Sequence, residues 1–252
     1  MDRSYLSRPE VIKASRNFVC IRTMTYESAE EARILRSIWG QGDLQNTVFA
    51  ILDPYGRSIV NGQRSPMRVF RDASDMATYM DKVAAHYRGY GSPTWLPGVD
   101  TVRLGLNVAA CDNRPLVIVV AATKSERDTL QARMAPTAWS DRLVGKLVYT
   151  AGSPSELRNI RGARISSGYL FVKPDEFGTE GEVVAQLGST ATASALASAA
   201  QQAAGINFLE KVSHREHVMR GRRSGKSWET AIPVTDQKAL QAQQRGPGRR
   251  SF

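Results

Sequence analysis

The longest apolar run of the chain, Leu116 to Ala122, sets the scale of its secondary structure. It is long enough for a buried strand and falls well short of the ~18 apolar residues that suggest a membrane span. Similar segments at 47–52 and 169–172 alternate with segments of helical periodicity. Strands separated by a helix tend to run parallel, whereas strands joined by a tight turn run antiparallel. The alternation therefore predicts an α/β fold with mixed sheets, whose apolar central strands require helices on both faces.

The second half of the chain contains the fuller set of predicted elements. In chain order they are a helix through 102–109, a strand at 116–120, a helix at 125–139, a strand at 143–149, a short helix at 155–159, strands at 169–172 and 182–187, and a helix at 190–204. The last two strands flank a stretch from Pro174 to Gly178, which favours a tight turn. This half therefore ends in a hairpin and a closing helix.

The first half repeats part of this order. Its predicted elements are a helix from Pro9, a strand at 18–24, a helix from Ser28 to Gly40, strands at 47–52 and 57–60, and a helix at 74–87. The turn between the paired strands is predicted at Asp53, Pro54 and Gly56, because proline fixes its own φ and glycine permits a positive one.

A glycine- and proline-rich stretch from 89 to 98 separates the two halves. We therefore predict a first domain at 1–90, a linker at 91–98, a second domain at 99–208 and a tail at 209–252. The chain has a formal charge of +10, and much of the positive excess lies in this tail. With so little apolar content, the tail is expected to be largely extended or disordered.

The order of elements, with a hairpin turn before the last strand and helix of each half, resembles the thioredoxin family. Three segments carry the resemblance: 46–56 in the first half, and 113–120 and 165–175 in the second. It covers roughly residues 5–88 and 99–204. It implies two thioredoxin-like three-layer α/β/α units with mixed sheets, followed by the basic tail.

The resemblance also locates a redox site that this chain lacks. Family oxidoreductases place Cys-x-x-Cys at the start of the helix after the central strand, where the helix N-terminus lowers the pKa of the first thiol. Here the segment 123–127 takes that place, and it contains no sulfur. The family's cis-proline, opposite that site, corresponds to Asn46 in the first half and to Ser166 or Ser167 in the second. The first half also lacks the family's first strands, so either its start is truncated or the neighbouring domain completes its sheet.

The two cysteines, Cys20 and Cys111, each lie in or beside a predicted core element, where a free cysteine usually behaves as a small apolar residue. Because the sequence contains no Cys-x-x-Cys, we expect no dithiol–disulfide exchange, and we interpret the chain as a non-catalytic binding or scaffold protein that presents surface loops to a protein partner. Two alternatives stay open. One is a thiol-redox protein that uses a lone cysteine or an active site upstream of this start. The other is a binder of nucleic acid or anionic surfaces through the basic tail.

Four basic residues crowd together early in the tail: Arg220, Arg222, Arg223 and Lys226. With Gly221 and Gly225 among them, they are predicted to form a solvated loop whose guanidinium groups can grip the phosphate or carboxylate of an acidic partner. The loop does not fit an ATP-binding phosphate loop, which needs four residues between its glycines, since three lie between Gly221 and Gly225.

Metal, cofactor and targeting signals are weak. Glu210, His214 and His217 have the spacing of one helical face that could bind zinc, but their charged surroundings favour a surface helix. We expect no metal and no cofactor. The first residues lack the apolar stretch of a secretory signal, so the sequence as given predicts a cytoplasmic protein, or an exported one if a leader is missing upstream.

Overall fold

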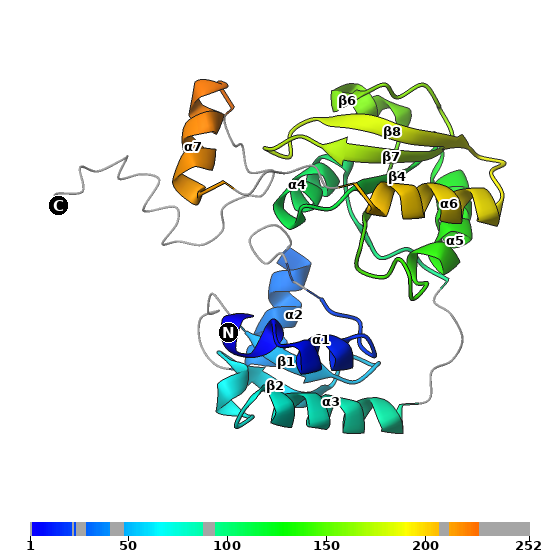
Figure 1. Ribbon diagram of the computed structural model, residues 1–252. Coiled ribbons are helices and arrows are strands. Elements are labelled where there is room, and N and C mark those ends of the chain that lie inside the picture. The colour runs from blue at the N-terminus through cyan, green and yellow to red at the C-terminus, as the bar shows by residue number, and fades with distance from the viewer. Residues whose placement is uncertain are drawn as a thin grey trace. The chain divides into compact units, whose positions relative to one another are not determined.

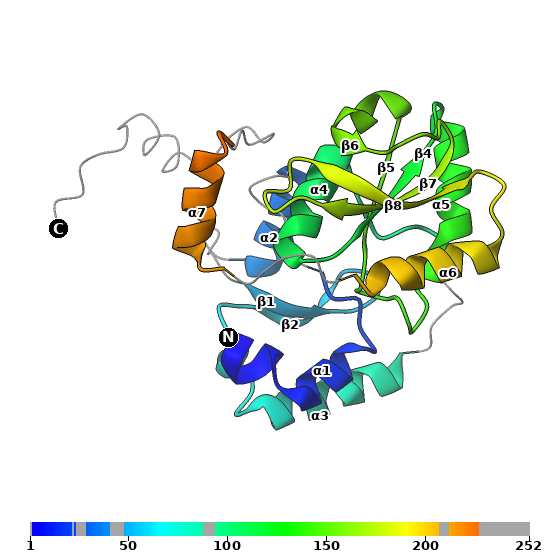
Figure 2. The same cartoon turned by 45° about the horizontal axis from the view of Figure 1, so that its top comes forward.

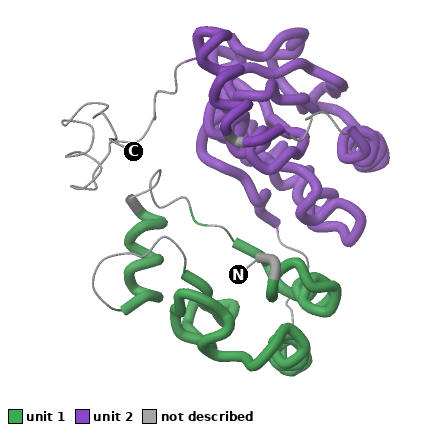
Figure 3. The backbone as a smooth tube through the Cα atoms, turned by 60° about the vertical axis from the view of Figure 1, so that its left-hand side comes forward, with its two compact units in different colours: residues 1–89, 228–252 green, residues 90–227 purple. Residues whose placement is uncertain are grey.

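The computed structural model of the protein describes residues 2–21, 23, 29–40, 48–87, 94–206 and 212–226. The chain divides into two compact units, which Figure 3 colours separately. Described residues up to 87 belong to unit 1, and those from 94 onward belong to unit 2. Helices accompany strands in both units and unit 2 has a mixed sheet, so the predicted α/β class is confirmed. None of the described helices has the length and apolar content needed to cross a bilayer.

Unit 2 is built on a six-stranded sheet with the strand order β3-β5-β4-β7-β8-β6. The strands are β3 (Gly98–Val99), β4 (Leu116–Val120), β5 (Val148–Gly152), β6 (Ile160–Arg161), β7 (Gly168–Pro174) and β8 (Gly181–Gly188). β3 and β4 both pair in parallel with β5, whereas β7 pairs antiparallel with β4 and with β8. The short β6 pairs in parallel with β8. The sheet is therefore mixed, as the alternation of helices and turns predicts.

Helices cover both faces of this sheet (Figures 1 and 2). The helices of unit 2 are α4 (Val102–Asp112), α5 (Lys124–Ala138), α6 (Ala193–Ala204) and α7 (His214–Arg223), with a 3-10 helix, η3 (Pro154–Asn159). α4 packs on one face, and α5 and α6 pack on the other. The two faces therefore have separate apolar cores with the sheet between them.

β4 shows why the central strand is apolar at every position. Val117 and Val119 face α5 and α6. Leu116, Ile118 and Val120 face α4. All five side chains are fully buried, because a strand with neighbours on both edges and helices on both faces has no side open to solvent. Each such side chain contributes about 1.5–3 kcal/mol on burial, so β4 is a main source of stability in unit 2.

β5 begins later than the sequence predicts. A strand is expected at 143–149, but the chain forms turns up to Leu147 and the strand starts at Val148. Gly145 has a φ of +72°, which no strand adopts. Leu143 and Leu147 are buried in the core beneath α5 and α6. These two apolar side chains hold a loop against the core, and they do not belong to a strand.

Unit 1 packs helices around a two-stranded sheet. Its elements are η1 (Asp2–Leu6, a π-helix), α1 (Pro9–Ser15), α2 (Ala29–Trp39), β1 (Phe49–Leu52), β2 (Ser58–Gln63), η2 (Pro66–Arg68) and α3 (Ala73–His86). β1 and β2 pair antiparallel through the predicted turn, in which the Asp53 carboxylate accepts hydrogen bonds from the backbone of Tyr55 and Arg57. The buried Ile51 and Val60 belong to a core that α1 and α3 complete.

Two predictions for this half differ from the structure. The described residues of unit 1 contain an antiparallel strand pair and no mixed sheet. They also contain no strand at 18–21, where Val19 and Ile21 are 56% and 76% exposed. A strand needs a neighbour for its backbone hydrogen bonds, and the β-branched composition of this segment does not supply one. The predicted helix cap Ser28 and the tail from residue 227 onward lie outside the described residues.

Candidate functional site

Three parallel strands of unit 2 end at the edge of the sheet where α5 begins. β3, β4 and β5 run in parallel, so their carboxyl ends meet at this edge, and α5 follows shortly after β4. β7 starts at the same edge, because it runs antiparallel to β4 and pairs Gly168 with Val120. Open α/β sheets bind ligands preferentially outside the carboxyl ends of their strands. This edge is therefore the first candidate site.

The first turn of α5 is held by contacts within the chain. Thr123 caps the helix, since its hydroxyl accepts a hydrogen bond of 3.3 Å from the backbone N–H of Glu126. Lys124 pairs with Asp128, one turn further on, at 2.6 Å. The Arg127 guanidinium turns back and donates to two carbonyl oxygens of the loop after β4, at 2.8 and 3.2 Å. Thr123, Lys124 and Arg127 are thus already engaged.

Ser167, just before β7, lies against this turn. Its hydroxyl donates a hydrogen bond to the carboxylate of Glu126. The sequence resemblance places Ser166 or Ser167 opposite the start of the helix, and Ser167 is the residue that makes the contact. Asn46, its counterpart in the first half, lies outside the described residues. The described peptide bonds are all trans.

A hollow of about 350 Å³ opens beside the first two turns of α5. The helix lines it with Lys124, Arg127 and Asp128. Asp100, just after β3, and Glu156, in the 3-10 helix η3 after β5, also line it. Both signs of charge therefore surround one hollow, which suits a ligand that carries both donors and acceptors.

Two polar side chains of the hollow remain available to a ligand. Glu156 is engaged, because it accepts hydrogen bonds from the backbone N–H and the hydroxyl of Ser153 at 2.8 and 3.1 Å. Asp100 and Gln131 also line the hollow, and in the part of the chain that the structure describes their side chains have no hydrogen-bond or ion-pair partner. Neither residue stands out in the sequence, because both depend on strands and a helix that meet only in the fold.

Both cysteines are exposed, which corrects the interpretation that they act as small apolar residues in or beside the core. Cys20 lies in the irregular segment after α1, in unit 1. Cys111 lies near the end of α4, after the buried Ala109 and Ala110. A helix turns by about 100° per residue, so the next position can point away from the core. α4 and α5 lie on opposite faces of the sheet, so Cys111 is also far from the place of a thiol site on α5.

The basic residues predicted to form a loop lie in and just after a helix. α7 contains Arg220, Arg222 and Arg223, and Lys226 follows it. The described part of the predicted extended tail is therefore helical at 214–223. Glycine at 221 suggests flexibility in the sequence, but Gly221 is buried in α7, and a Cβ there would lie 3.3 Å from the ring of Phe177. This glycine permits close packing of α7 on its neighbour.

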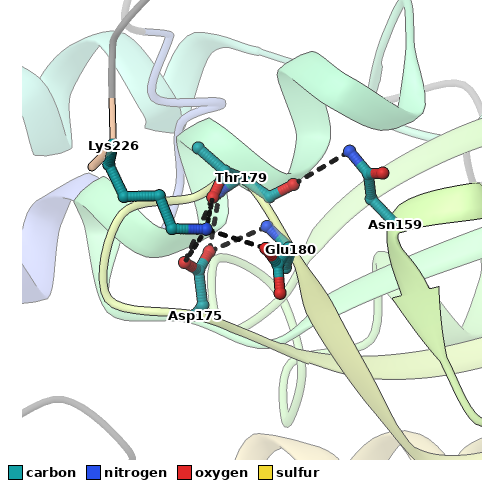
Figure 4. Close-up of polar contacts among 5 residues, drawn as sticks. All are labelled: Asn159, Asp175, Thr179, Glu180 and Lys226. Carbon is teal, nitrogen blue, oxygen red and sulfur yellow. Dashed lines mark hydrogen bonds and ion pairs between the residues drawn. The ribbon is translucent and has the colours of Figure 1, made fainter. Parts of the chain in front are cut away.

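Lys226 binds the turn between β7 and β8 (Figure 4). Its Nζ lies 2.7 Å from the Glu180 carboxylate, 3.0 Å from the Thr179 hydroxyl and 4.0 Å from the Asp175 carboxylate. Asp175 also holds the turn itself, because it accepts hydrogen bonds of 2.7 and 2.9 Å from the backbone N–H groups of Thr179 and Glu180. Lys226, three residues after the end of α7, is thus fixed to a hairpin that lies much earlier in the chain.

α7 covers the same turn with ring and charge contacts. The ring centroids of His217 and Phe177 lie 5.2 Å apart. Glu176 Oε1 is a buried oxygen that has no hydrogen-bond partner within the described residues. His217 Nδ1 and Arg220 Nη1 approach it at 3.4 and 3.8 Å, and Arg220 also pairs with Glu216 at 2.6 Å. Arg220 supplies the positive charge that compensates this half-buried carboxylate.

The remaining predicted residues have no common site. Arg222 and Arg223 are exposed. Glu210 and the side chain of His214 lie outside what the structure describes, and His217 contacts Glu176. Over the described ranges no group of three His, Cys, Asp or Glu residues is placed to hold a metal ion.

Comparisons of the chain with protein-family models, with curated proteins and with solved structures find no match. Two surfaces of unit 2 are the candidate sites that the contacts above define. One is the edge of the sheet at the start of α5, and the other is α7 with the turn that it covers.

Proposed function

We propose that this chain is a non-catalytic protein-binding or scaffold protein built from thioredoxin-like units. The order of elements in unit 2 supports this: β3, α4, β4, α5, β5, the hairpin of β7 and β8, and α6. Parallel pairing across the helices and antiparallel pairing across the hairpin agree with the resemblance. Unit 1 offers less support, which consists of the hairpin of β1 and β2 and the helix α3 that follows it.

The chemistry of the first turn of α5 carries the proposal. Thiol–disulfide exchange proceeds through a mixed disulfide at an activated cysteine, which a helix N-terminus favours. At this helix N-terminus Thr123 uses its hydroxyl as the cap, and Glu126, three positions later, accepts a hydrogen bond from Ser167. None of these side chains can form a mixed disulfide. The edge retains the surface of a binding site and lacks the group that exchange requires.

A partner at this edge would use the hollow beside α5. Asp100 and Gln131 are available for hydrogen bonds, and the exposed pair of Lys124 and Asp128 can exchange its partners for those of a ligand. An extended peptide segment carries backbone donors and acceptors along its length. Such a segment fits a polar hollow with both signs of charge better than a purely apolar ligand does.

Installing a cysteine pair tests both the fold and the lack of catalysis. Thr123→Cys with Glu126→Cys, made in a C20S/C111S background, has the Cys-x-x-Cys spacing at the start of α5. The helix N-terminus should lower the pKa of the first thiol, so we expect insulin disulfide reduction to appear in this variant. The matched control moves the same spacing to exposed positions in the middle of α5, as T129C/A132C, and should show much less activity.

The opposite results would overturn the two parts of the proposal separately. Insulin reduction by the unmodified protein that disappears in C20S/C111S would show a lone-cysteine redox protein, an alternative that the exposure of both thiols favours. Equal activity of the two installed pairs would remove the support for a thioredoxin-like site at α5.

Binding itself is tested by crosslinking from the hollow. A photoreactive residue replaces Gln131 in one protein and Arg142, exposed in the loop before β5, in the control. We expect a discrete protein adduct from position 131 only, and a polar unlabelled peptide identified from that adduct should compete with it. Adducts of equal yield from both positions, or none from position 131, would contradict a binding site in the hollow.

A further inference from the structure

The sequence of α7 gives this helix two faces of different character. At 3.6 residues per turn, His217, Arg220 and Gly221 fall on one side of the helix. The opposite side carries Arg215, Met219, Arg222 and Arg223, which span an arc of about 100°. We call these four residues the outward face of α7. All four are exposed, and Met219 is 41% exposed at the centre of the arc.

Cations of α7 and of the segment after it pair with the acidic groups of the neighbouring turn. Arg220 compensates Glu176, and Lys226 binds Glu180 and Asp175. The only carboxylate within α7 is Glu216, and Arg220 holds it at 2.6 Å. The local acidic residues are therefore paired with cations other than those of the outward face.

The outward face keeps its positive charge as a result. Within residues 212–226 and the rest of the described chain, no carboxylate pairs with Arg215, Arg222 or Arg223. The inner face of α7 is fixed by the ring contact of His217 with Phe177 and by the pairing of Arg220 with Glu176, and Lys226 ties the segment after the helix to Glu180. Three arginines are thus presented together on a helix whose rotation is set by its packing.

We propose that the outward face of α7 binds the phosphate backbone of a nucleic-acid duplex. Guanidinium groups bind phosphate oxygens in a bidentate manner and are charged at all physiological pH values. Arg215 and Arg222 are two helical turns apart, about 10 Å along the axis. A duplex carries one negative charge per ~1.7 Å, so each of the three arginines reaches a phosphate of its own.

The composition of this face favours a duplex over two other anionic partners. An interfacial helix needs a broad apolar face, and here Met219 is the one large apolar side chain of the outward face. Proteins that bind single strands stack bases on aromatic side chains, and α7 contains no Phe, Tyr or Trp. Contacts to the backbone of a duplex require neither feature.

This proposal is independent of the binding function at α5. The turn that α7 covers follows the end of β7, where Val172 pairs with Leu116 at the amino end of β4. The start of α5 lies at the opposite, carboxyl end of β4. A ligand at one edge of the sheet therefore leaves the other edge open.

The test measures the binding of the full chain to a fluorescent 25-base-pair DNA duplex between 50 and 200 mM salt. The variant is Arg215→Gln with Arg222→Gln and Arg223→Gln. The matched control removes the same charge from exposed positions at the amino ends of β4 and β5, as R114Q/R142Q/K146Q. Each phosphate contact contributes about 0.9 to the slope of log affinity against log salt, so three contribute about 2.7. Over this fourfold range in salt, the unmodified protein should lose about 40-fold more affinity than the α7 variant.

Four results would overturn the proposal. In the first two, the unmodified protein does not bind the duplex at 50 mM salt, or the α7 variant keeps the full salt dependence. In the third, the control loses as much affinity as the α7 variant. In the fourth, binding to a single strand or to a vesicle of anionic lipid depends on the three arginines more strongly than binding to the duplex does. Hydrogen exchange of the α7 amides in each variant verifies that the helix stays packed. The expected pattern is a loss confined to the α7 variant and to the duplex.

Discussion

Replacing Gly221 with alanine should raise the helix propensity of α7 and crowd its packing at the same position. Alanine is more favourable than glycine inside a helix by about 1 kcal/mol. Against this gain, the new Cβ would lie 3.3 Å from Cε1 and 3.6 Å from Cδ1 of Phe177. The first distance is below the optimum of about 3.5–4.0 Å between carbon atoms. The helix must retreat slightly from the turn that it covers.

The cost of this retreat falls on the contacts of the inner face. It lengthens the approaches of His217 and Arg220 to Glu176, now 3.4 and 3.8 Å, and weakens a ring contact of a kind worth about 0.5–1.5 kcal/mol. Gain and loss are similar, so we expect Gly221→Ala alone to change the free energy of opening of α7 by less than about 0.5 kcal/mol. In a Phe177→Ala background the obstacle is gone, and the same change should stabilise α7 by about 1 kcal/mol.

Amide hydrogen exchange of residues 214–223 in the four proteins of this double-mutant cycle measures the coupling. A coupling energy near 1 kcal/mol corresponds to about a fivefold difference in protection. If Gly221→Ala has the same effect on protection with and without the Phe177 ring, close packing against this ring does not require glycine at position 221. The account of how α7 is oriented would then be wrong.

Two further substitutions give expected results of their own. Tyr149→Phe should leave stability at pH 7 unchanged or raise it by up to about 1 kcal/mol, because the buried hydroxyl has no hydrogen-bond partner among the described residues. Burial also raises the pKa of Tyr149, so its contribution to stability is complete below the ordinary tyrosine pKa of about 10 and is lost as the pH rises above it. Urea midpoints from pH 8 to 11 should therefore fall less in Y149F, and an equal fall would contradict this. Lys226→Gln should lower the free energy of opening of α7, measured by amide exchange, by about 1 kcal/mol. The Lys124 side chain is 82% exposed, so Lys124→Gln should lower the free energy of opening of α5 by a few tenths of a kcal/mol at most. Equal costs would refute the distinction.

The elements that the sequence predicts well are those in which local pattern and final packing agree. The run from Leu116 to Val120 is apolar throughout because β4 is buried on both faces, so its composition already encodes its place. The turns at Asp53 and Asp175 are equally local, since each carboxylate accepts hydrogen bonds from the backbone a few residues later.

Prediction fails where distant contacts decide what a residue does. Leu143 and Leu147 look like strand residues, yet they anchor a loop beneath α5 and α6. Gly221 resembles a flexible loop glycine, and only Phe177, far earlier in the chain, explains it. The contact between Ser167 and Glu126 joins residues 41 positions apart, and no local pattern indicates it. The availability of Asp100 and Gln131 has no local signal at all.

The two hairpin turns in the described part of the chain differ in how well they would accept a foreign peptide. Surface turns are the usual places to insert an epitope tag, because loop entropy grows slowly with added length. The turn at Asp53 is held by contacts among its own residues, so the effect of a tag after Tyr55 should stay confined to this turn. The turn from Asp175 to Glu180 also holds Lys226 and supports α7, so a tag after Phe177 would separate this helix from the sheet. A label meant to report on the intact protein belongs in the first turn.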